Sequence, residues 1–474
     1  MNVENDSKKT AITATLNASA NIISLIVGMV MVPILTRVIS TTDLGLATTF
    51  ISSRNILTIV FTFAIYAYVN KAMLEFPNEK KNYVFSLTLF CLASVAVFFV
   101  LCLPFKKQIQ GLLGFDNFLF FWLFISCFAF AIYNIGNYYC TFHNFYKIVA
   151  SMVLVIGTFA PVLSVVLAYF MKDRKYIGRV VGVDAGYVLV ALVFGLWTII
   201  FGKKKFGTKY IKRSLKFTVP VMPHLLSQVL LTQCDLLMIG YISGKDKAGI
   251  YSMGHTVGYL ALTVVVQIMA AWSPWVYRRF EEKNLSVVKK NSRLIIIVCS
   301  YISLGLLTLS AELVKLFLPP EYLPCIYMVP PLVTATYFEF LYLFFYDILY
   351  YNKKAKLIAF ASIVTSILNI VLNVIFINIY GYMAACYTTA FSYLVLIIMA
   401  YVMCRKYKVH EIYNIAYILA WIAVIIGYSI LVMFFANSIL IRYGVFAGIT
   451  VFLFFLKRKE ILDFVKNFRK MGDK

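Results

Sequence analysis

The feature of this sequence that most constrains its fold is a long series of apolar segments, each about as long as a bilayer is thick. A helix needs roughly 20 mostly apolar residues to cross the hydrocarbon core of a membrane. Fourteen segments meet this requirement, and short polar connections separate them. They span approximately 11–39, 44–70, 83–104, 117–142, 148–171, 177–201, 214–241, 248–276, 288–310, 325–351, 356–378, 382–404, 412–435 and 438–456. The sequence therefore predicts an all-α polytopic membrane protein with about fourteen transmembrane helices.

The composition excludes a soluble protein of this size. Of the 474 residues, 62% are hydrophobic and only 14% are charged, which leaves too little polar side chain to cover a water-exposed surface. The first apolar run is longer than the core of a signal peptide, and no small-residue cleavage site follows it. We therefore expect the first helix to be retained.

Lys and Arg are distributed unevenly over the connections, which predicts an orientation. With a cytoplasmic N-terminus, 32 of the 44 Lys and Arg fall on the inner side and 10 on the outer side, while Arg37 and Arg54 lie within helices. Because cytoplasmic loops are enriched in Lys and Arg, both termini are predicted to be cytoplasmic, in a bacterial inner membrane. The alternation favours an even number of helices, with twelve as the alternative. It also explains the net charge of +24 without nucleic acid.

A weak internal repeat divides the chain into halves. Pro33–Gly45 and Leu237–Gly249 each contain a helix end, a tight polar turn and a Gly that opens the next helix. Two related halves, with the substrate site between them near the bilayer midplane, are typical of transporters. We expect two pseudo-symmetric six-helix bundles, joined by a cytoplasmic basic linker and followed by a terminal helix pair and a basic amphipathic tail. In chain order these domains are 1–201 (bundle), 202–213 (linker), 214–405 (bundle), 406–456 (helix pair) and 457–474 (tail).

Four groups of short motifs, spread over most of residues 10–405, carry a family resemblance. They are Arg37–Gly45; Pro220–Pro223 with Cys234, Asp235 and Ala248–Tyr251; Ala271–Pro274; and Asn352–Lys354 with Ser366–Asn369, Asn373 and Tyr380–Ala385. In this order and spacing they resemble the MOP superfamily of exporters and, within it, the polysaccharide-unit flippases of the Wzx type. The sequence departs from the family pattern at Leu236. The family often has Arg at this position, directly after the Asp of helix 7, which is Asp235 here.

The resemblance implies movement of an undecaprenyl-diphosphate-linked oligosaccharide repeat unit from the cytoplasmic to the outer leaflet by alternating access. This step serves assembly of a capsule, O-antigen or exopolysaccharide. The implied partners are the lipid-linked oligosaccharide and membrane lipids, with a polysaccharide polymerase and glycosyltransferases as further candidates and no nucleic acid. A multidrug or metabolite cation antiporter and a peptidoglycan lipid II flippase of the same fold remain alternatives.

Enzymatic activity is not expected. The sequence has no G-x-x-x-x-G-K-[ST] loop for ATP hydrolysis and no large outer loop of the kind typical of oligosaccharide polymerases. The nine Cys form no CxxC pair and no His/Cys cluster, so we interpret them as packing residues and expect neither a metal site nor disulfides. We expect no catalytic residues and no cofactor beyond coupling to a proton or a sodium ion.

Ionisable residues at membrane depth are the candidate site, since a charge near a helix centre costs about 2.5–3.5 kcal/mol on insertion scales. Arg54, Arg37 and His255 are the candidate substrate-binding residues, with the two Arg side chains holding the diphosphate through their planar forks. Alternatively, Arg37 extends to the outer interface and Arg54 pairs with an acid. His255 is either cavity-facing or a packing residue.

Two acids are candidates for coupling to an ion. Glu339 is the one closest to mid-membrane, and Asp235 either binds a proton or sodium ion or pairs with a neighbour. Asn369 and Asn373 lie one turn apart and form a polar stripe with Ser366, for which hydrogen bonding between helices is the favoured interpretation.

Overall fold

The computed structural model describes the backbone of residues 3–201, 205–407 and 409–472, and the side chains of Leu16 and of residues 19–200, 205–407 and 409–455. Thirteen of its helices are long and apolar enough to cross a membrane, and Ile439–Phe455 is a shorter apolar helix. These fourteen elements match the fourteen predicted segments. The chain is an all-helical, multi-pass membrane protein.

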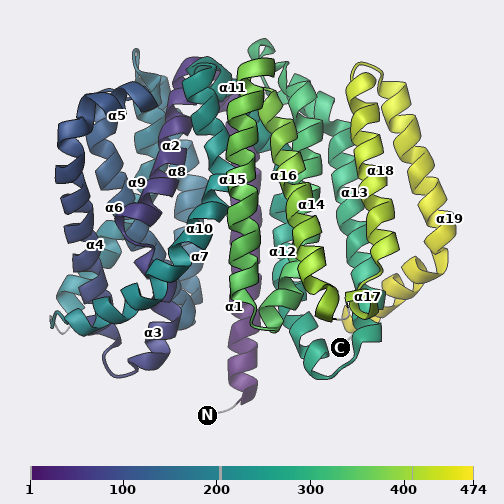
Figure 1. Cartoon of the computed structure of the whole chain (residues 1–474), viewed down its shortest axis with the longest axis horizontal. Helices are drawn as coiled ribbons and strands as arrows, with labels where there is room; N and C mark the ends of the chain where they lie inside the picture. The colour runs from purple at the N-terminus through teal and green to yellow at the C-terminus, as the bar shows by residue number, and fades with distance from the viewer. Residues whose placement is uncertain (1–2, 202–204, 408, 473–474) are drawn as a thin grey trace.

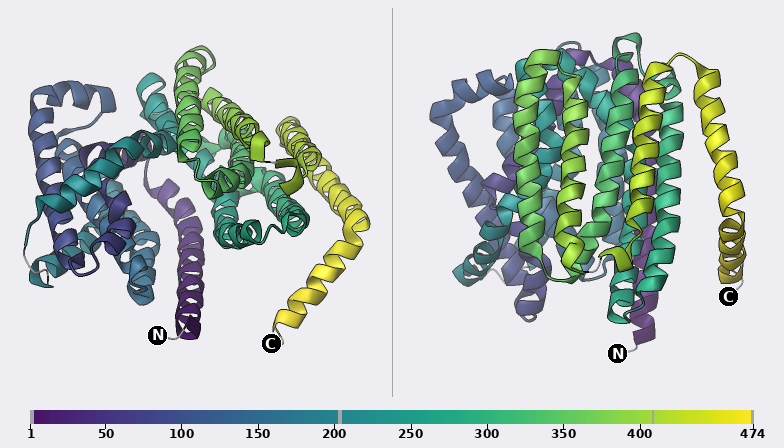
Figure 2. Two further views of the ribbon diagram at one scale, coloured as in Figure 1. Left: turned by 60° about the horizontal axis from the view of Figure 1, so that its bottom comes forward. Right: turned by 45° about the vertical axis from the view of Figure 1, so that its right-hand side comes forward.

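The helices form two groups, with α1 and α10 between them and both termini at the same edge (Figures 1 and 2). The first half contains α1 (Val3–Val38), α2 (Thr41–Phe61), α3 (Val69–Glu75), α4 (Lys80–Cys102), α5 (Lys106–Leu113), α6 (Asn117–Phe142), α7 (Tyr146–Leu154), α8 (Ala160–Phe170) and α9 (Lys175–Phe201). The second half contains α10 (Thr208–Ile242), α11 (Lys245–Gly258), α12 (Leu260–Glu281), α13 (Leu285–Phe317), α14 (Cys325–Tyr351), α15 (Ala355–Tyr380) and α16 (Ala384–Cys404). The chain ends with α17 (Val409–Ile412), α18 (Ile415–Phe434) and α19 (Ile439–Gly472).

The centre of the second group is α14, which is buried along nearly its whole length. It contacts α11, α12, α13, α16 and α18. A helix that is apolar on every side is stable only when other helices surround it or when lipid does. Here protein surrounds it, so α14 is the axis around which this group packs.

Helix 2, predicted to run over 44–70, is interrupted. The structure ends α2 at Phe61 and places Phe63 and Ala64 at positive φ, 51° and 48°. Two consecutive non-glycine residues in the left-handed region are strained. The hydroxyl of Ser94 on α4 donates to the Phe61 carbonyl at 2.6 Å, which satisfies one backbone group that the interruption releases.

The two glycines of the internal repeat face each other where the halves meet. Gly45 on α2 and Gly249 on α11 pack so closely that a Cβ on Gly45 would overlap the Lys245 carbonyl. A Cβ on Gly249 would likewise overlap the Thr41 carbonyl. Small residues allow helix backbones to approach in this way. The halves therefore touch backbone to backbone at the edge opposite the chain termini, and we call this contact the outer seam.

The terminal helix pair is anchored by a buried arginine. Arg442 on α19 is 0% exposed and forms a bidentate ion pair with Glu312 on α13, and it also donates to the Thr308 carbonyl. The Tyr428 hydroxyl of α18 donates to the Arg442 carbonyl at 2.9 Å. Of the predicted tail, 457–474, the backbone continues α19 as far as Gly472, whereas its side chains lie outside the described residues.

Replacing Gly45 or Gly249 with Ala will open the outer seam. Overpacking a tight contact costs about 1–3 kcal/mol, which corresponds to roughly a 5- to 150-fold shift between conformations. The measurement is labelling, by a membrane-impermeant maleimide, of a Cys at buried Thr49 in a Cys102→Ser background. Gly305→Ala is the matched control, because its Cβ meets open space. Equal labelling of all three variants would show that the seam does not depend on these glycines.

Candidate functional site

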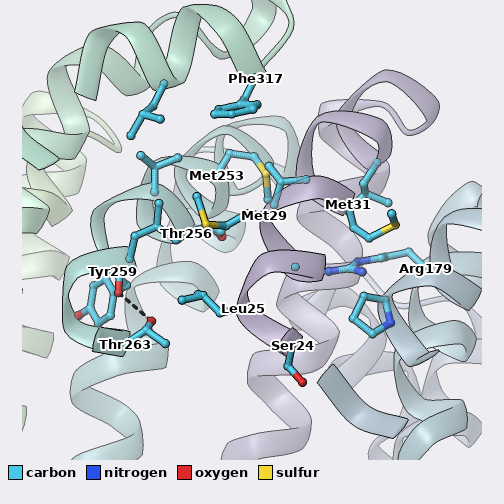
Figure 3. A pocket seen from close by; sticks show the side chains of 17 residues that line it. Ser24, Leu25, Met29, Met31, Arg179, Met253, Thr256, Tyr259, Thr263 and Phe317 are labelled. Atoms are coloured by element: carbon cyan, nitrogen blue, oxygen red, sulfur yellow. Dashed lines mark hydrogen bonds between the residues drawn. The ribbon is translucent and has the colours of Figure 1, made fainter. Parts of the chain in front are cut away.

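A cavity of about 410 Å³ lies between the two halves (Figure 3). Side chains of α1, α8 and α9 form one wall, and side chains of α11, α12 and α13 form the other. Most of the lining is apolar, and none of the described residues that line it is Asp or Glu. Its lining residues are Ser24, Leu25, Gly28, Met29, Met31, Val32, Leu35, Pro161, Arg179, Met253, Thr256, Val257, Tyr259, Leu260, Thr263, Leu313 and Phe317.

Arg179 is the one charged residue in this lining. Its guanidinium reaches from α9 towards α1 and lies near Met31 (Figure 3). Nη1 donates to the Ser164 hydroxyl at 2.7 Å, and within the described part of the chain no carboxylate forms an ion pair with Arg179. A guanidinium has five N–H donors, so most of this group's hydrogen-bonding capacity remains open to a ligand in the cavity.

A stripe of glycines positions Arg179. Gly178, Gly182 and Gly186 recur every fourth residue on α9 and pack against the backbone and small side chains of α8. A Cβ on Gly182 would overlap the backbone of Ser164, the residue that binds the guanidinium. The close helix contact therefore draws Arg179 against α8 and holds it at the cavity wall.

Arg54 lies inside the first half and does not line the cavity. It is 2% exposed and forms an ion pair with Asp184 of α9. Asp184 also accepts hydrogen bonds from Trp122 Nε1, at 2.9 Å, and from the Ser126 hydroxyl. The guanidinium carbon lies 4.9 Å and 4.7 Å from the ring centroids of Phe130 and Tyr187. The ion pair and the aromatic rings together enclose the charge of Arg54. This arrangement corresponds to the alternative interpretation, in which Arg54 pairs with an acid.

Arg37 lies at the end of α1 and is exposed. Its Nη1 donates to the Pro33 carbonyl at 2.8 Å and to the Phe317 carbonyl of α13 at 3.4 Å. Nearby, Lys175 Nζ donates to the Val38 carbonyl at 2.8 Å. Arg37 therefore links α1 to the second half near the outer seam. Its partner Phe317 also lines the cavity at this end.

Asp235 is buried among neutral donors. Its Oδ2 accepts hydrogen bonds from the Tyr251 hydroxyl at 2.8 Å and the Thr389 hydroxyl at 2.6 Å, and Oδ1 accepts from Asn373 Nδ2 at 2.6 Å. Asn369 donates to Thr389 at 3.2 Å, so the predicted asparagine stripe does connect helices. No Lys or Arg among the described residues pairs with this carboxylate. Dipoles, rather than a cation, hold Asp235.

His255 and Glu339 lie on two helices of the second half, close to the cavity. The His255 ring stacks on Tyr259, with centroids 3.8 Å apart and an interplanar angle of 18°. Tyr259 lines the cavity, whereas neither His255 nor Glu339 belongs to the lining. Tyr393 of α16 lies against both Tyr259 and Glu339. The structure thus brings two predicted site residues into one cluster behind the cavity wall.

The N-terminal end of α10 is attached to the first half by ion pairs. Arg213 makes two hydrogen bonds to Glu75, of 2.9 and 3.0 Å, and Lys209 lies 2.6 Å from Glu79. Hydrogen bonding by the Arg213 guanidinium lowers the pKa of Glu75 to about 2. The pair is therefore charged throughout the physiological pH range. Further along α10, Pro220 and Pro223 lie inside the continuous helix, where neither has a backbone N–H to donate.

A sequence profile described as "Polysaccharide biosynthesis protein" matches residues 13–280, more than half of the chain. The chain belongs to this family. It has the fold of a solved transporter of the MOP superfamily. No curated protein matches the sequence significantly.

Solved structures share the fold of this polysaccharide biosynthesis protein at low identity. One is a "Lipid II flippase MurJ, inward closed conformation", with a TM-score of 0.71 and 15% identity over 94% of this chain and 100% of that one. Another is an inward-facing multidrug resistance MATE family transporter of the MOP superfamily, with a TM-score of 0.60 and 12% identity over 84% and 98% of the two chains. A MATE in complex with MaL6 has a TM-score of 0.53 and 12% identity over 85% and 96%.

The sequence analysis of this family member does not predict that Arg179 lines the cavity. Arg179 groups with the outer-side charges because it follows Lys172, Arg174 and Lys175 closely. The signal that could have placed it within a packed helix is the Gly178, Gly182 and Gly186 repeat, which favours close contact with another helix. Arg37 and Arg54, in contrast, are held by protein groups and do not meet each other in the cavity.

Removing one partner of the Arg54–Asp184 pair will destabilise the transporter strongly. A buried charge left without its partner costs about 3–5 kcal/mol, whereas replacing both partners by apolar residues costs far less. We expect Asp184→Asn to lower the melting temperature in detergent and Arg54→Leu with Asp184→Leu to recover most of it. Glu282→Gln, which removes an exposed pair with Arg279, is the control. If Asp184→Asn melts like the control, the pair does not support the fold.

Proposed function

We propose that this transporter moves an undecaprenyl-diphosphate-linked oligosaccharide repeat unit from the inner to the outer leaflet of the bacterial cytoplasmic membrane. The product would feed the assembly of a surface polysaccharide such as a capsule, O-antigen or exopolysaccharide. The family description, which concerns polysaccharide biosynthesis, supports this substrate class.

The observation that carries the proposal is the unpaired Arg179 in an otherwise apolar cavity between the halves. Arg binds phosphate oxygens bidentately through charge-assisted hydrogen bonds. The apolar walls suit the polyprenyl part of such a substrate, and Ser24, Thr256 and Thr263 offer hydroxyl groups. The cavity thus combines one site for an anion with a surface for a lipid chain.

The same composition argues against a cation antiporter. A site for organic or metal cations needs carboxylates, and the described lining has none. A lipid II flippase would also need a cationic group for a diphosphate, so the cavity alone does not separate it from our proposal. The family match favours a polysaccharide repeat unit, and competition between the two lipids provides the experimental comparison.

The way in which the halves meet supports alternating access. The outer seam at Gly45 and Gly249 closes the cavity at the edge opposite the termini, and Arg37 adds a contact to α13. We propose that 1–201 and 214–405 move as two units about α10, while 406–456 follows the second unit through Arg442. In this scheme both termini and the basic loops face the cytoplasm.

The coupling ion would act within the second half. Asp235 is a buried carboxylate that receives four hydrogen bonds from neutral groups, a setting in which a proton or a sodium ion would neutralise the charge. Glu339 on α14 also has no cationic partner among the described residues. Binding of an ion to either would change the free energy of the packed second half and bias its movement.

Arg179→Gln will weaken substrate binding and transport. A hydrogen bond to a charged group contributes about 1.5–3 kcal/mol, so the affinity for undecaprenyl diphosphate in detergent micelles should fall roughly 10- to 150-fold. In a deletion strain the variant should leave lipid-linked repeat units on the inner leaflet. Arg179→Lys should retain part of the affinity because it keeps the charge.

Arg174→Gln is the matched control, since it removes an exposed Arg from the same end of α9 outside the cavity. Normal export by Arg179→Gln together with unchanged binding would exclude Arg179 as the diphosphate contact. If purified lipid II competes with undecaprenyl diphosphate while the repeat-unit lipid does not, the transporter is a lipid II flippase.

A further inference from the structure

Tyrosine and asparagine side chains form a wall inside the first half, which neither the Arg179 cavity nor the outer seam uses. They come from α6, from α9 and from the short 3-10 helix η1 (Ile65–Tyr68), which follows the interruption of helix 2. Each of these side chains is partly exposed. They are Tyr66, Tyr133, Asn134, Asn137, Tyr138 and Tyr187, and we call them the tyrosine wall.

The tyrosine rings of the wall lie against one another. Tyr66 and Tyr138 stack, with ring centroids 6.5 Å apart and an interplanar angle of 10°. The ring of Tyr133 lies 5.2 Å from that of Tyr187, at an angle of 73°, and Tyr133 also lies close to Tyr138. The Tyr187 ring covers the buried guanidinium of Arg54. The wall therefore continues from Arg54 along α6 and α9, towards the edge at which the chain termini lie (Figure 1).

The position of the wall on α6 shows which way it faces. Trp122, Ser126 and the wall residues of α6 are spaced one or two helical turns apart, so they share a face of the helix. Trp122 and Ser126 donate hydrogen bonds to Asp184 of α9, and this face therefore points into the first half. The exposed apolar residues Phe121 and Ile125 lie on another side of α6. The wall is thus not part of an aromatic belt that faces lipid.

Most hydrogen-bonding groups of the wall are unused. The hydroxyls of Tyr66, Tyr133 and Tyr138 and the amide of Asn137 form no hydrogen bond with the residues that the structure describes, and none of their polar atoms is enclosed. Asn134 Nδ2 donates to a backbone carbonyl of its own helix at 2.8 Å, which leaves its side-chain oxygen free to accept. Polar groups at membrane depth are costly unless they pair or face water. The wall therefore borders a space that water or a polar ligand fills.

This combination of groups suits a sugar. A sugar ring presents C–H groups on its faces and hydroxyl groups around its edge. Aromatic rings pack against such faces, while amides and phenol hydroxyls exchange hydrogen bonds with the sugar hydroxyls. The six wall residues include no acid and no Lys or Arg, which favours a polar ligand without a charge. A hydrocarbon chain would leave the amides and hydroxyls without partners, at a cost in free energy.

The wall and the Arg179 cavity share a helix. Arg179 and Tyr187 are both on α9 and are separated by two turns, about 12 Å along the helix axis. In a lipid-linked repeat unit the sugar chain begins at the diphosphate, the group that we assign to Arg179. A chain of a few sugar rings spans the distance from there to the wall.

We propose that the tyrosine wall binds the sugar residues of the lipid-linked repeat unit while Arg179 binds its diphosphate. This proposal rests on the transport function proposed above. A glycosylated carrier and bare undecaprenyl diphosphate present the same diphosphate, so Arg179 cannot distinguish them. The wall supplies this distinction, and it determines the specificity for the cargo.

The first test compares two lipids that share the diphosphate and differ in the sugar. The probes are undecaprenyl diphosphate and the repeat-unit lipid extracted from the deletion strain, each bound to the full-length transporter in detergent micelles. Asn137→Ala removes neutral hydrogen bonds and should weaken binding of the repeat-unit lipid roughly 2- to 10-fold. Tyr133→Ala combined with Tyr138→Ala removes two ring faces and should weaken it roughly 10-fold or more. Undecaprenyl diphosphate should bind both variants as it binds the parent, whereas Arg179→Gln should weaken both lipids.

Tyr169→Ala is the matched control, since it removes an exposed tyrosine of α8 that lies outside the wall. It should change the affinity for neither lipid. Unchanged binding of the repeat-unit lipid by both wall variants overturns the proposal, and so does an equal loss for the two lipids, which indicates a purely structural role. If these variants bind and export the repeat unit as the parent does, the transport function stands and the sugar site fails. If lipid II binds through the wall and the repeat-unit lipid does not, the proposed function fails and the sugar site stands.

A second measurement tests whether the wall faces a space that the sugar occupies. Asn137→Cys, in the Cys102→Ser background, should react with a membrane-impermeant maleimide in inside-out vesicles. The repeat-unit lipid should slow this reaction, and undecaprenyl diphosphate should not. Ile125→Cys, on the lipid-facing side of the same helix, is the control and should remain unlabelled. A cysteine at the wall that does not react, or that the repeat-unit lipid does not protect, would also contradict the sugar site.

Discussion

The structure depends above all on the free energy of charges in a medium that cannot solvate them. Arg54 and Arg442 are almost completely buried, and each is neutralised by an acid from a distant helix, Asp184 and Glu312. These pairs hold α2 to α9 and the terminal helix pair to α13. Once they are satisfied, few charges at membrane depth remain without an opposite charge. Arg179 and Glu339 are two of them, and both lie at or directly behind the cavity wall.

Much of the fold could be predicted because the lipid bilayer determines the length and the composition of the helices that cross it. Twenty-residue apolar runs and the placement of Lys and Arg encode the transmembrane helices locally, so the fourteen predicted segments and their order agree with the structure. The site could be predicted only in part. Which Arg faces a cavity depends on contacts between residues about 130 positions apart, such as Arg54 with Asp184, and no local pattern contains that information. Arg179 could not be predicted for a different reason. It lies close to the charged loop residues in the sequence, although its side chain lies at the cavity wall.

The contact between the halves bears on the proposed transport of a lipid-linked anion, which requires that the cavity opens. At the outer seam the helix ends that carry Gly45 and Gly249 approach backbone to backbone, and Leu44 on α2 and Tyr251 on α11 belong to one buried core cluster there. The cavity beneath it is largely apolar, so opening exposes few polar groups that would need new partners. Arg54 and Asp184 pair within the first half, and Arg442 and Glu312 join the terminal helix pair to the second half, whereas Arg213 and Glu75 tie the start of α10 to the first half.

The position of Arg54 has a consequence for how the protein is made. Helix 2 leaves the ribosome with its arginine, and the acid that neutralises it is encoded 130 residues later. At translation rates of about 5–20 residues per second, the interval is roughly 6 to 26 s. During that time a helix of modest hydropathy carries an unpaired cation in the membrane, at an insertion cost of about 2.5–3.5 kcal/mol. Until the first six helices have been inserted, helix 2 therefore lacks the acid that neutralises its arginine.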